Sequence, residues 1–293
     1  MKIQKGDKVG IVCCSNGQSL TKKEEIDNLA LVLKEIGLVP VLSKYIYQNE
    51  YEFQNVYLKK EKEYRALVES GTPQERAKVL MDFYKDNSIK AIFDISGGDI
   101  ANTLLPYLDY EQIASSDKQF WGYSDLTTVI NAIYVKTGKT SVLYQIRNLL
   151  YEYSEQQRKD FIKNNLYEFP YEFYQGDTLQ GVVVGGNIRC FLKLAGTEYF
   201  PDLTDKILLL EARSGSSAQI LTYFSQLEQT GAFKKVKGIL LGTFTQMERE
   251  KEFPDVYQLL KRYITPELPV IKTPSIGHGA DSKAIEIGEE YKF

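Results

Sequence analysis

The sequence contains few of the residues that build disulfide frameworks and metal centres. It has three cysteines, Cys13, Cys14 and Cys190, and a single histidine, His278, in 293 residues. Adjacent cysteines rarely bridge each other and three is an odd number, so we expect reduced core thiols, as in cytoplasmic proteins. Cys13 and Cys14 lack the spacing of zinc ligands, and the histidine is far away in sequence. The sequence therefore predicts no disulfide, no metal and no other cofactor.

Long apolar runs and an excess of positive charge are also missing. The sequence has no apolar run of about 18 residues, so no membrane span is expected. Residues 1–7 lack an apolar signal region, which favours a cytoplasmic location. The formal net charge is −3, whereas proteins that bind nucleic acids or membrane surfaces present a basic face. We therefore expect neither of these partners.

The first half of the chain alternates strand and helix patterns. Apolar runs typical of buried parallel strands alternate with segments that carry a helical apolar stripe. The expected strands cover residues 8–14, 38–42, 91–95 and 119–123, and the expected helices cover 21–36, 72–84 and 128–137. Repeated strand–helix units predict an α/β fold with a parallel sheet and helices on both of its faces.

The second half has a different pattern. Expected strands at 181–187, 206–211, 238–242, 269–272 and 284–287, with a helix at 217–230, indicate a more β-rich domain. The polar and aromatic stretch 151–175 separates the two patterns and is the expected connection. A chain of 293 residues accommodates two domains. We therefore predict an N-terminal domain over residues 1–165 and a C-terminal domain over 176–293.

One turn in the first half has the form of an active-site corner. Gly97 and Gly98 lie between an expected strand and an expected helix, where backbone N–H groups can approach an anion or oxyanion. Hydrolases often place Ser or Cys at such a corner, but this chain offers Ala101. A phosphate site is disfavoured, because the glycine-rich phosphate motifs are absent and Asp99 would repel an anion.

Two further side chains are candidates for proton transfer. His278, between two glycines, is the residue type that most often acts as a general base near neutral pH. The alternative is a surface or capping histidine. Glu211 ends an apolar strand, where a carboxylate can orient a histidine as the acid of a triad does. Its alternative role is a strand-end charge paired with Arg213.

The glycine turn, Glu211 and His278, in this order along the chain, resemble motifs of the LD-carboxypeptidases and the related microcin C immunity peptidases. These families are serine hydrolases with a Ser-Glu-His triad. The matching segments extend over most of the chain. They are residues 5–11, 72–77, 97–98, 104–110, 122–127, 185–187, 207–211, 238–242 and 277–278. The resemblance implies a Rossmann-like N-terminal domain, a β-rich C-terminal domain, an active site between them and a homodimer.

The resemblance also implies roles for single residues. Glu211 and His278 become the orienting acid and the general base, and Ala101 takes the position of the family's serine. The backbone N–H groups near Gly98 and Asn102 would form the oxyanion hole.

The remaining predicted contacts are with the substrate. Gly97 and Ser124, at the ends of expected strands, and Arg147 are expected to bind the oxyanion or the substrate. Arg147 or Arg213 could hold a substrate carboxylate through paired hydrogen bonds. The expected ligand is a small peptide or a muropeptide.

The sequence departs from the family's pattern near this site. Residues 143–148 lack the usual Gly-Pro, and residues 279–282 replace the expected Thr-Asp-Pro. The alanine at position 101, where the family has its serine, has three explanations. They are a natural branch that has lost hydrolysis, an engineered Ser→Ala change, or a nucleophile that has shifted to another residue. The candidates for a shifted nucleophile are Ser96, Thr103, Ser214, Ser216 and Ser217.

The sequence thus predicts a serine hydrolase fold for cleavage of amide bonds in muropeptides or peptidyl conjugates. The hydrolytic activity is expected to be impaired or absent, because Ala101 replaces the serine. The alternative function is a non-catalytic protein that binds a peptide or a peptidoglycan fragment in the same cleft.

Overall fold

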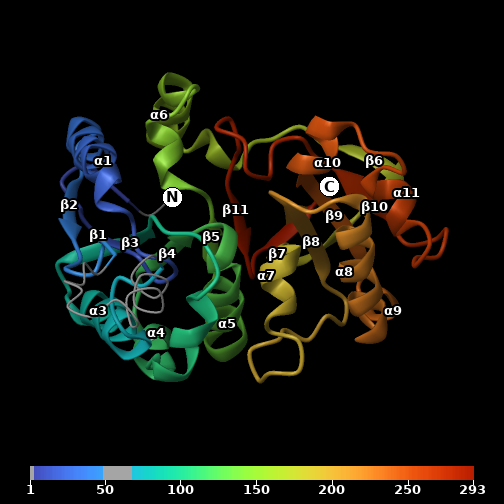
Figure 1. Cartoon of the computed structure of the whole chain (residues 1–293), viewed down its shortest axis with the longest axis horizontal. Helices are drawn as coiled ribbons and strands as arrows, with labels where there is room; N and C mark the ends of the chain where they lie inside the picture. The colour runs from blue at the N-terminus through green and yellow to red at the C-terminus, as the bar shows by residue number, and fades with distance from the viewer. Residues whose placement is uncertain (1–2, 49–67) are drawn as a thin grey trace, which may run out of the picture.

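The chain folds around two sheets that lie side by side (Figure 1). The computed structural model describes residues 3–48 and 68–293, and within them each sheet has six strands. The order in the first sheet is β11 (Ile285–Ile287), β5 (Ser141–Leu143), β4 (Gln119–Gly122), β3 (Ile89–Asp94), β1 (Lys8–Val12) and β2 (Val39–Leu42). Strands β1 to β5 are parallel, and β11 is antiparallel to β5.

The second sheet has a parallel centre with one antiparallel strand at each edge. Its order is β12 (Glu290–Lys292), β7 (Gln180–Asn187), β8 (Ile207–Ala212), β9 (Gly238–Phe244), β10 (Val270–Lys272) and β6 (Glu172–Gln175). Every residue of β8 is buried, which explains its uninterrupted apolar sequence before Glu211. Strands β12 and β6 are the antiparallel members.

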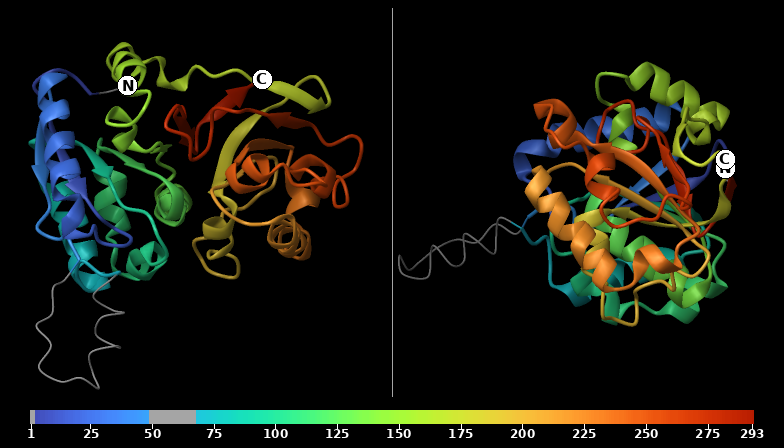
Figure 2. Two further views of the ribbon diagram at one scale, coloured as in Figure 1. Left: turned by 45° about the horizontal axis from the view of Figure 1, so that its top comes forward. Right: turned by 90° about the vertical axis from the view of Figure 1, so that its right-hand side faces the viewer.

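Helices pack around both sheets (Figure 2). In the first half they are α1 (Lys23–Glu35), α3 (Pro73–Lys85), α4 (Tyr110–Ser115), α5 (Thr127–Thr137) and α6 (Ser154–Lys163). In the second half they are α7 (Ile188–Leu192), α8 (Ser217–Gln229), α9 (Ala232–Lys235), α10 (Thr245–Glu250) and α11 (Val256–Leu260). Short 3₁₀ turns are η1 (Leu20–Lys22), η2 (Ala101–Tyr107), η3 (Ser124–Leu126), η4 (Ile146–Leu149) and η5 (Asn165–Tyr167).

Local sequence accounts for several helix ends. A capping box between Thr72 and Glu75 begins α3, because each side chain satisfies a backbone N–H of the other. Gly138, with φ +68°, ends α5 in the left-handed conformation that favours glycine. Within the described ranges, no helix combines the length and apolar composition that a membrane crossing requires.

The predicted α/β class is confirmed, but two expectations about the second half need correction. Residues 151–175 are not a bare connection, since they contain α6, η5 and β6. Residues 284–287 do not extend the second sheet, because β11 pairs with β5 of the first. The second half also carries five helices in addition to its strands. The domain limits at residues 165 and 176 stay a prediction.

One hydrophobic core continues from one sheet to the other. It contains Ile92 of β3, Val129 of α5, Val183 of β7 and Leu209 of β8. Asn131 of α5 adds a polar link, because its side chain exchanges hydrogen bonds with the backbone of Gly185. Figure 1 shows α5 and α7 between the two sheets. The shared core fixes the loops after β3 and β4 relative to the loop after β8.

Candidate active site

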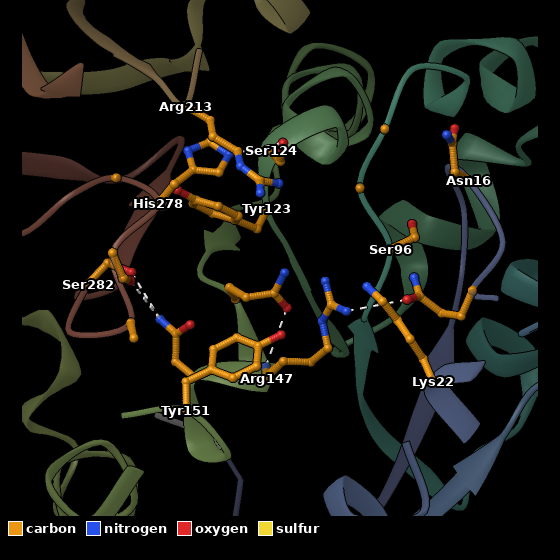
Figure 3. A pocket seen from close by; sticks show the side chains of 18 of the residues that line it. Asn16, Lys22, Ser96, Tyr123, Ser124, Arg147, Tyr151, Arg213, His278 and Ser282 are labelled. Carbon is orange, nitrogen blue, oxygen red and sulfur yellow. Dashed lines mark hydrogen bonds between the residues drawn. The ribbon is translucent and has the colours of Figure 1, made fainter. Parts of the chain in front are cut away.

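Three polar side chains from distant parts of the chain form a hydrogen-bonded row. His278 Nδ1 lies 2.8 Å from Glu211 Oε2. His278 Nε2 lies 3.1 Å from Ser124 Oγ, and Figure 3 labels both of these residues. Glu211 is fully buried, and the imidazole is 8% exposed. A carboxylate on one ring nitrogen and a hydroxyl on the other is the arrangement of a serine hydrolase triad. The expected pairing of Glu211 with His278 therefore exists.

Ser124 is positioned by a strained turn between a strand and a helix. It follows β4 and opens η3, which leads directly into α5. Its φ of +56° lies in the left-handed region, where non-glycine residues are uncommon. Such a strand–turn–helix corner is the nucleophile elbow of hydrolases, which presents a serine hydroxyl above the sheet.

Ala101 follows the Gly97-Gly98 turn, as the sequence predicted, but its side chain does not face His278. It is fully buried within the hydrophobic core, at the start of η2. Its backbone N–H donates to Asp125 Oδ2 at 2.8 Å, and it does not line the pocket that contains His278. The hydroxyl that contacts His278 Nε2 is that of Ser124, and the assignment of Ala101 to the nucleophile position stays a prediction.

The residues considered as shifted nucleophiles do not reach His278 either. Ser96 lines the pocket, but its buried hydroxyl donates to Asp94 Oδ1. The Thr103 hydroxyl donates to the carbonyl of Ile100. The three serines after β8 are not among the residues that line the pocket: Ser214, Ser216 and Ser217.

The residue after Ser124 anchors the corner. Asp125 is fully buried and accepts hydrogen bonds from Ser15 Oγ at 2.6 Å and from Ala101 N. Its second oxygen lies 2.5 Å from Lys193 Nζ, which comes from the second half of the chain. One carboxylate thus joins the loops after β1 and β3 to the residue that follows α7.

The Gly97-Gly98 turn lies beside Ser124. A Cβ added to Gly97 would be 3.8 Å from Ser124 Cβ, so the backbone passes close to the hydroxyl. Gly98 has φ +128°, and a Cβ there would collide with the side chain of Asn16. Position 98 of this turn therefore requires glycine. Asn102, expected at the same place, does not line the pocket.

These groups open into a cavity of about 600 Å³ with cationic walls. Lys22, Arg147 and Arg213 line it, and no aspartate or glutamate does among the described residues. The predicted placement of Gly97, Gly98, Ser124 and Arg147 at one site agrees with this lining. Sequence reasoning did not single out Lys22 or Tyr151, which also contribute to the walls.

Tyr123 packs directly against the histidine. The centres of its ring and of the His278 ring are 4.4 Å apart. Burial, together with the nearby Glu211 carboxylate, holds the pKa of the Tyr123 phenol well above its usual range. Its hydroxyl has no hydrogen-bond partner in the described part of the chain. Tyr123 was not predicted as a site residue. The sequence feature that could have indicated it is its position between Gly122 and Ser124, at the end of a strand.

Comparisons with known proteins show the family of the chain. Residues 9–144 match the LD-carboxypeptidase N-terminal domain, and residues 180–293 match the LD-carboxypeptidase C-terminal domain. The microcin C7 self-immunity protein MccF of Escherichia coli is 29% identical, over 59% of this chain and 61% of its own length. A protein of Bacillus subtilis named "Probable murein peptide carboxypeptidase" is 26% identical, over 98% of this chain and 88% of its own.

The fold also matches solved structures. MccF in complex with aspartyl sulfamoyl adenosine superposes with a TM-score of 0.84, at 23% identity, over 98% of this chain and 93% of that one. The similarity therefore extends over both sheets and includes the elements that carry Ser124, Glu211 and His278.

Proposed function

The chain belongs to the LD-carboxypeptidase family, and we propose that it is an active serine hydrolase. The reaction is cleavage of an amide bond next to a free carboxylate, in a muropeptide or a peptidyl conjugate. The observation that carries the proposal is the position of His278, which contacts Ser124 through one ring nitrogen and Glu211 through the other.

The proposed reaction proceeds through a covalent acyl-enzyme. Ser124 Oγ attacks the scissile carbonyl carbon, and His278 Nε2 accepts the hydroxyl proton. His278 then gives this proton to the leaving amine as the C–N bond breaks. Water attacks the ester, loses a proton to His278, and Ser124 regains a proton as the acid product leaves. Glu211 stabilises the imidazolium and holds Nδ1 protonated.

Backbone N–H groups near Ser124 are proposed to stabilise the oxyanion. In hydrolases with a nucleophile elbow, the donors are the N–H of the residue after the serine and one from a neighbouring loop. Here these positions are Asp125 and the Gly97-Gly98 turn. The support is the close approach of Gly97 to Ser124 and the anchoring of Asp125 by Lys193.

Arg213 is proposed to hold the terminal carboxylate of the substrate. It follows Glu211 by two residues, is exposed, and lies next to Ser124 and His278 in Figure 3. Its guanidinium forms no ion pair with another residue in 3–48 or 68–293. An arginine beside the nucleophile suits a carboxypeptidase, because the terminal carboxylate is one residue from the scissile bond.

The test is incubation with a muropeptide tetrapeptide and mass spectrometry for released D-Ala, with a peptidyl-nucleotide conjugate as a second substrate. We expect release by the unmodified protein and a loss on the order of a million-fold in Ser124→Ala. Ala101→Ser is the comparison, because it adds a hydroxyl at the position that the family resemblance assigns to the serine. Release that requires Ala101→Ser, or binding without any turnover, would contradict the proposal. Homodimer formation and a cytoplasmic location stay predictions.

A further inference from the structure

The loop that carries His278 connects the two sheets. It leaves β10 of the second sheet and leads into β11 of the first. A backbone hydrogen bond closes its base, because Lys283 N donates to the carbonyl of Ser275 at 2.7 Å. Residues 275–283 therefore form one closed loop, and the contacts of this loop with its surroundings decide which half of the molecule sets the position of the imidazole.

Two buried amides attach this loop to the first half of the chain. Asn148 of η4 donates through Nδ2 to Ser282 Oγ at 3.0 Å and to the carbonyl of Gly279 at 3.4 Å. Gln157 of α6 donates through Nε2 to the carbonyl of Ser282 at 3.1 Å. Asn148 is 3% exposed and Gln157 is 2% exposed. Hydrogen bonds at this depth are stronger than those at the surface, because water does not compete for them.

Gln157 is fixed from its other end as well. Its Oε1 accepts the Tyr144 hydroxyl at 2.7 Å, and Tyr144 is itself buried directly after β5. Because a carbonyl oxygen only accepts, the amide N–H of Gln157 must face Ser282. An ion pair adds a further link to α6, since Lys283 Nζ lies 2.6 Å from Asp160 Oδ2. The loop is thus held by a connected network that begins in the first half.

The two segments in contact are the ones that depart from the family's pattern. Residues 143–148 contain Asn148, and residues 279–282 contain both of the groups to which it donates. The two departures are therefore parts of one connected structural change. Neither Tyr144 nor Gln157 is among the described residues that line the cavity, so contact with a ligand does not account for them.

We propose that Asn148 and Gln157 are positioning residues that keep His278 in register with Ser124. This inference rests on the proposed function, in which His278 is the base for Ser124. The imidazole lies between the Ser124 hydroxyl, which follows β4 of the first sheet, and the Glu211 carboxylate, which belongs to β8 of the second. Anchoring the loop on η4 and α6 fixes the imidazole relative to the half that carries the hydroxyl.

The single histidine provides a test that needs no turnover. A proton–nitrogen correlation spectrum of isotopically labelled protein, at a pH where the imidazole is neutral, should show one ring that is protonated at Nδ1. Gln157→Met removes both hydrogen bonds of the amide at nearly constant volume. It should add a second set of imidazole signals or bring the two nitrogen signals closer together, because the loop no longer holds the ring against Glu211 and the tautomers mix.

Tyr144→Phe is the matched control. It removes a buried hydrogen bond from the same network but leaves the donor of Gln157 to Ser282 in place. The imidazole spectrum should therefore stay that of the unmodified protein. Asn148→Leu, which removes the second amide, should change the spectrum as Gln157→Met does, and it carries the same test if Gln157→Met does not fold.

Steady-state kinetics with the muropeptide tetrapeptide separates positioning from substrate binding. A displacement of about 1 Å can cost about a hundredfold in rate. Gln157→Met should therefore lower kcat about 10- to 100-fold. Its KM should change less than about twofold, because Gln157 is outside the lining that the described residues form. Tyr144→Phe should lower kcat less than about twofold, and urea denaturation of both variants shows whether their losses of stability are comparable.

Two outcomes would overturn the proposal. One is an unchanged imidazole spectrum in Gln157→Met and Asn148→Leu. The other is an equal fall of kcat in Gln157→Met and Tyr144→Phe, because a general loss of stability would then explain both. A changed spectrum, in a protein whose unmodified form does not hydrolyse, would support this inference and contradict the proposed function. Hydrolysis together with an unchanged spectrum would do the reverse.

Discussion

Glu211 is the residue on which the chemistry of His278 depends. Its Oε2 contacts Nδ1, and its Oε1 is buried without a described partner. Glu211→Gln keeps the shape but removes the charge that stabilises the imidazolium and selects the tautomer. We expect kcat to fall about ten-thousand-fold. Steady-state kinetics would measure this, with thermal unfolding as the check that the fold is retained. A fall of less than tenfold would contradict the role of Glu211.

The three cysteines are expected to be inert in the folded protein. Cys13, Cys14 and Cys190 are buried and unpaired, as the sequence predicted. Burial raises the pKa of each thiol, and the Asp94 carboxylate adds to this at Cys13 and Cys14. Because only the thiolate reacts, a disulfide reagent at pH 8 should label no thiol in the native protein and all three in urea. A fast-reacting native thiol would contradict this.

Of the three side chains in the hydrogen-bonded row, the sequence singled out Glu211 and His278 for proton transfer but not Ser124 as their hydroxyl partner. Glu211 and His278 are recognisable because a lone histidine and a strand-end carboxylate carry chemistry that few other positions offer. Ser124 was expected at the end of a strand, as a residue that binds the oxyanion or the substrate, and it does follow β4 directly after Tyr123. Its positive φ and its distance to His278 arise from packing across 154 residues of chain, which no local pattern records.

At the scale of elements, α7 links the second half to the active-site turn. Arg189 of α7 pairs with Asp99, and its guanidinium also donates to the carbonyl of Gly98 at 2.9 Å. Lys193, which caps α7, donates to the carbonyl of Asp99 at 2.8 Å and pairs with Asp125. The position of this short helix therefore sets the position of the proposed oxyanion turn.

Lys193→Met tests this link. It leaves the fully buried Asp125 carboxylate without its cation, so we expect a loss of about 3 kcal/mol in the free energy of unfolding. Urea denaturation measures that loss. Lys136→Met is the control, because the Lys136–Glu198 pair is far more exposed and should contribute less than about 1 kcal/mol. Equal effects of the two changes would show that Lys193 has no special role.

Long elements were predictable and short ones were not. The buried strands β3 and β8 and the helices α3 and α5 follow from apolar periodicity and capping. Strands β11 and β12 have three residues each, and their partners in the sheets lie between 108 and 146 residues away in the sequence. A three-residue apolar run does not specify which sheet it joins, so the sequence pattern did not identify β5 as the partner of β11.

At the scale of the whole molecule, the two sheets depend on one C-terminal segment. Strand β11 completes the first sheet, and β12, three residues later, completes the second. The hydrophobic core that contains Val129 and Leu209 also joins the two sheets. Neither half can therefore lose its structure without exposing apolar surface of the other.

We therefore expect both halves to unfold in one transition. The single tryptophan, Trp121, is fully buried in the first sheet and reports on that half alone. Far-UV circular dichroism reports on both halves. In urea, the fluorescence and dichroism curves should have the same midpoint, which is the test of a two-state transition.

Deletion of residues 285–293 removes β11 and β12, and should lower the midpoint seen by Trp121 as well as that seen by dichroism. A tryptophan transition that is separate from the dichroism transition, or unaffected by the deletion, would show that the halves fold independently.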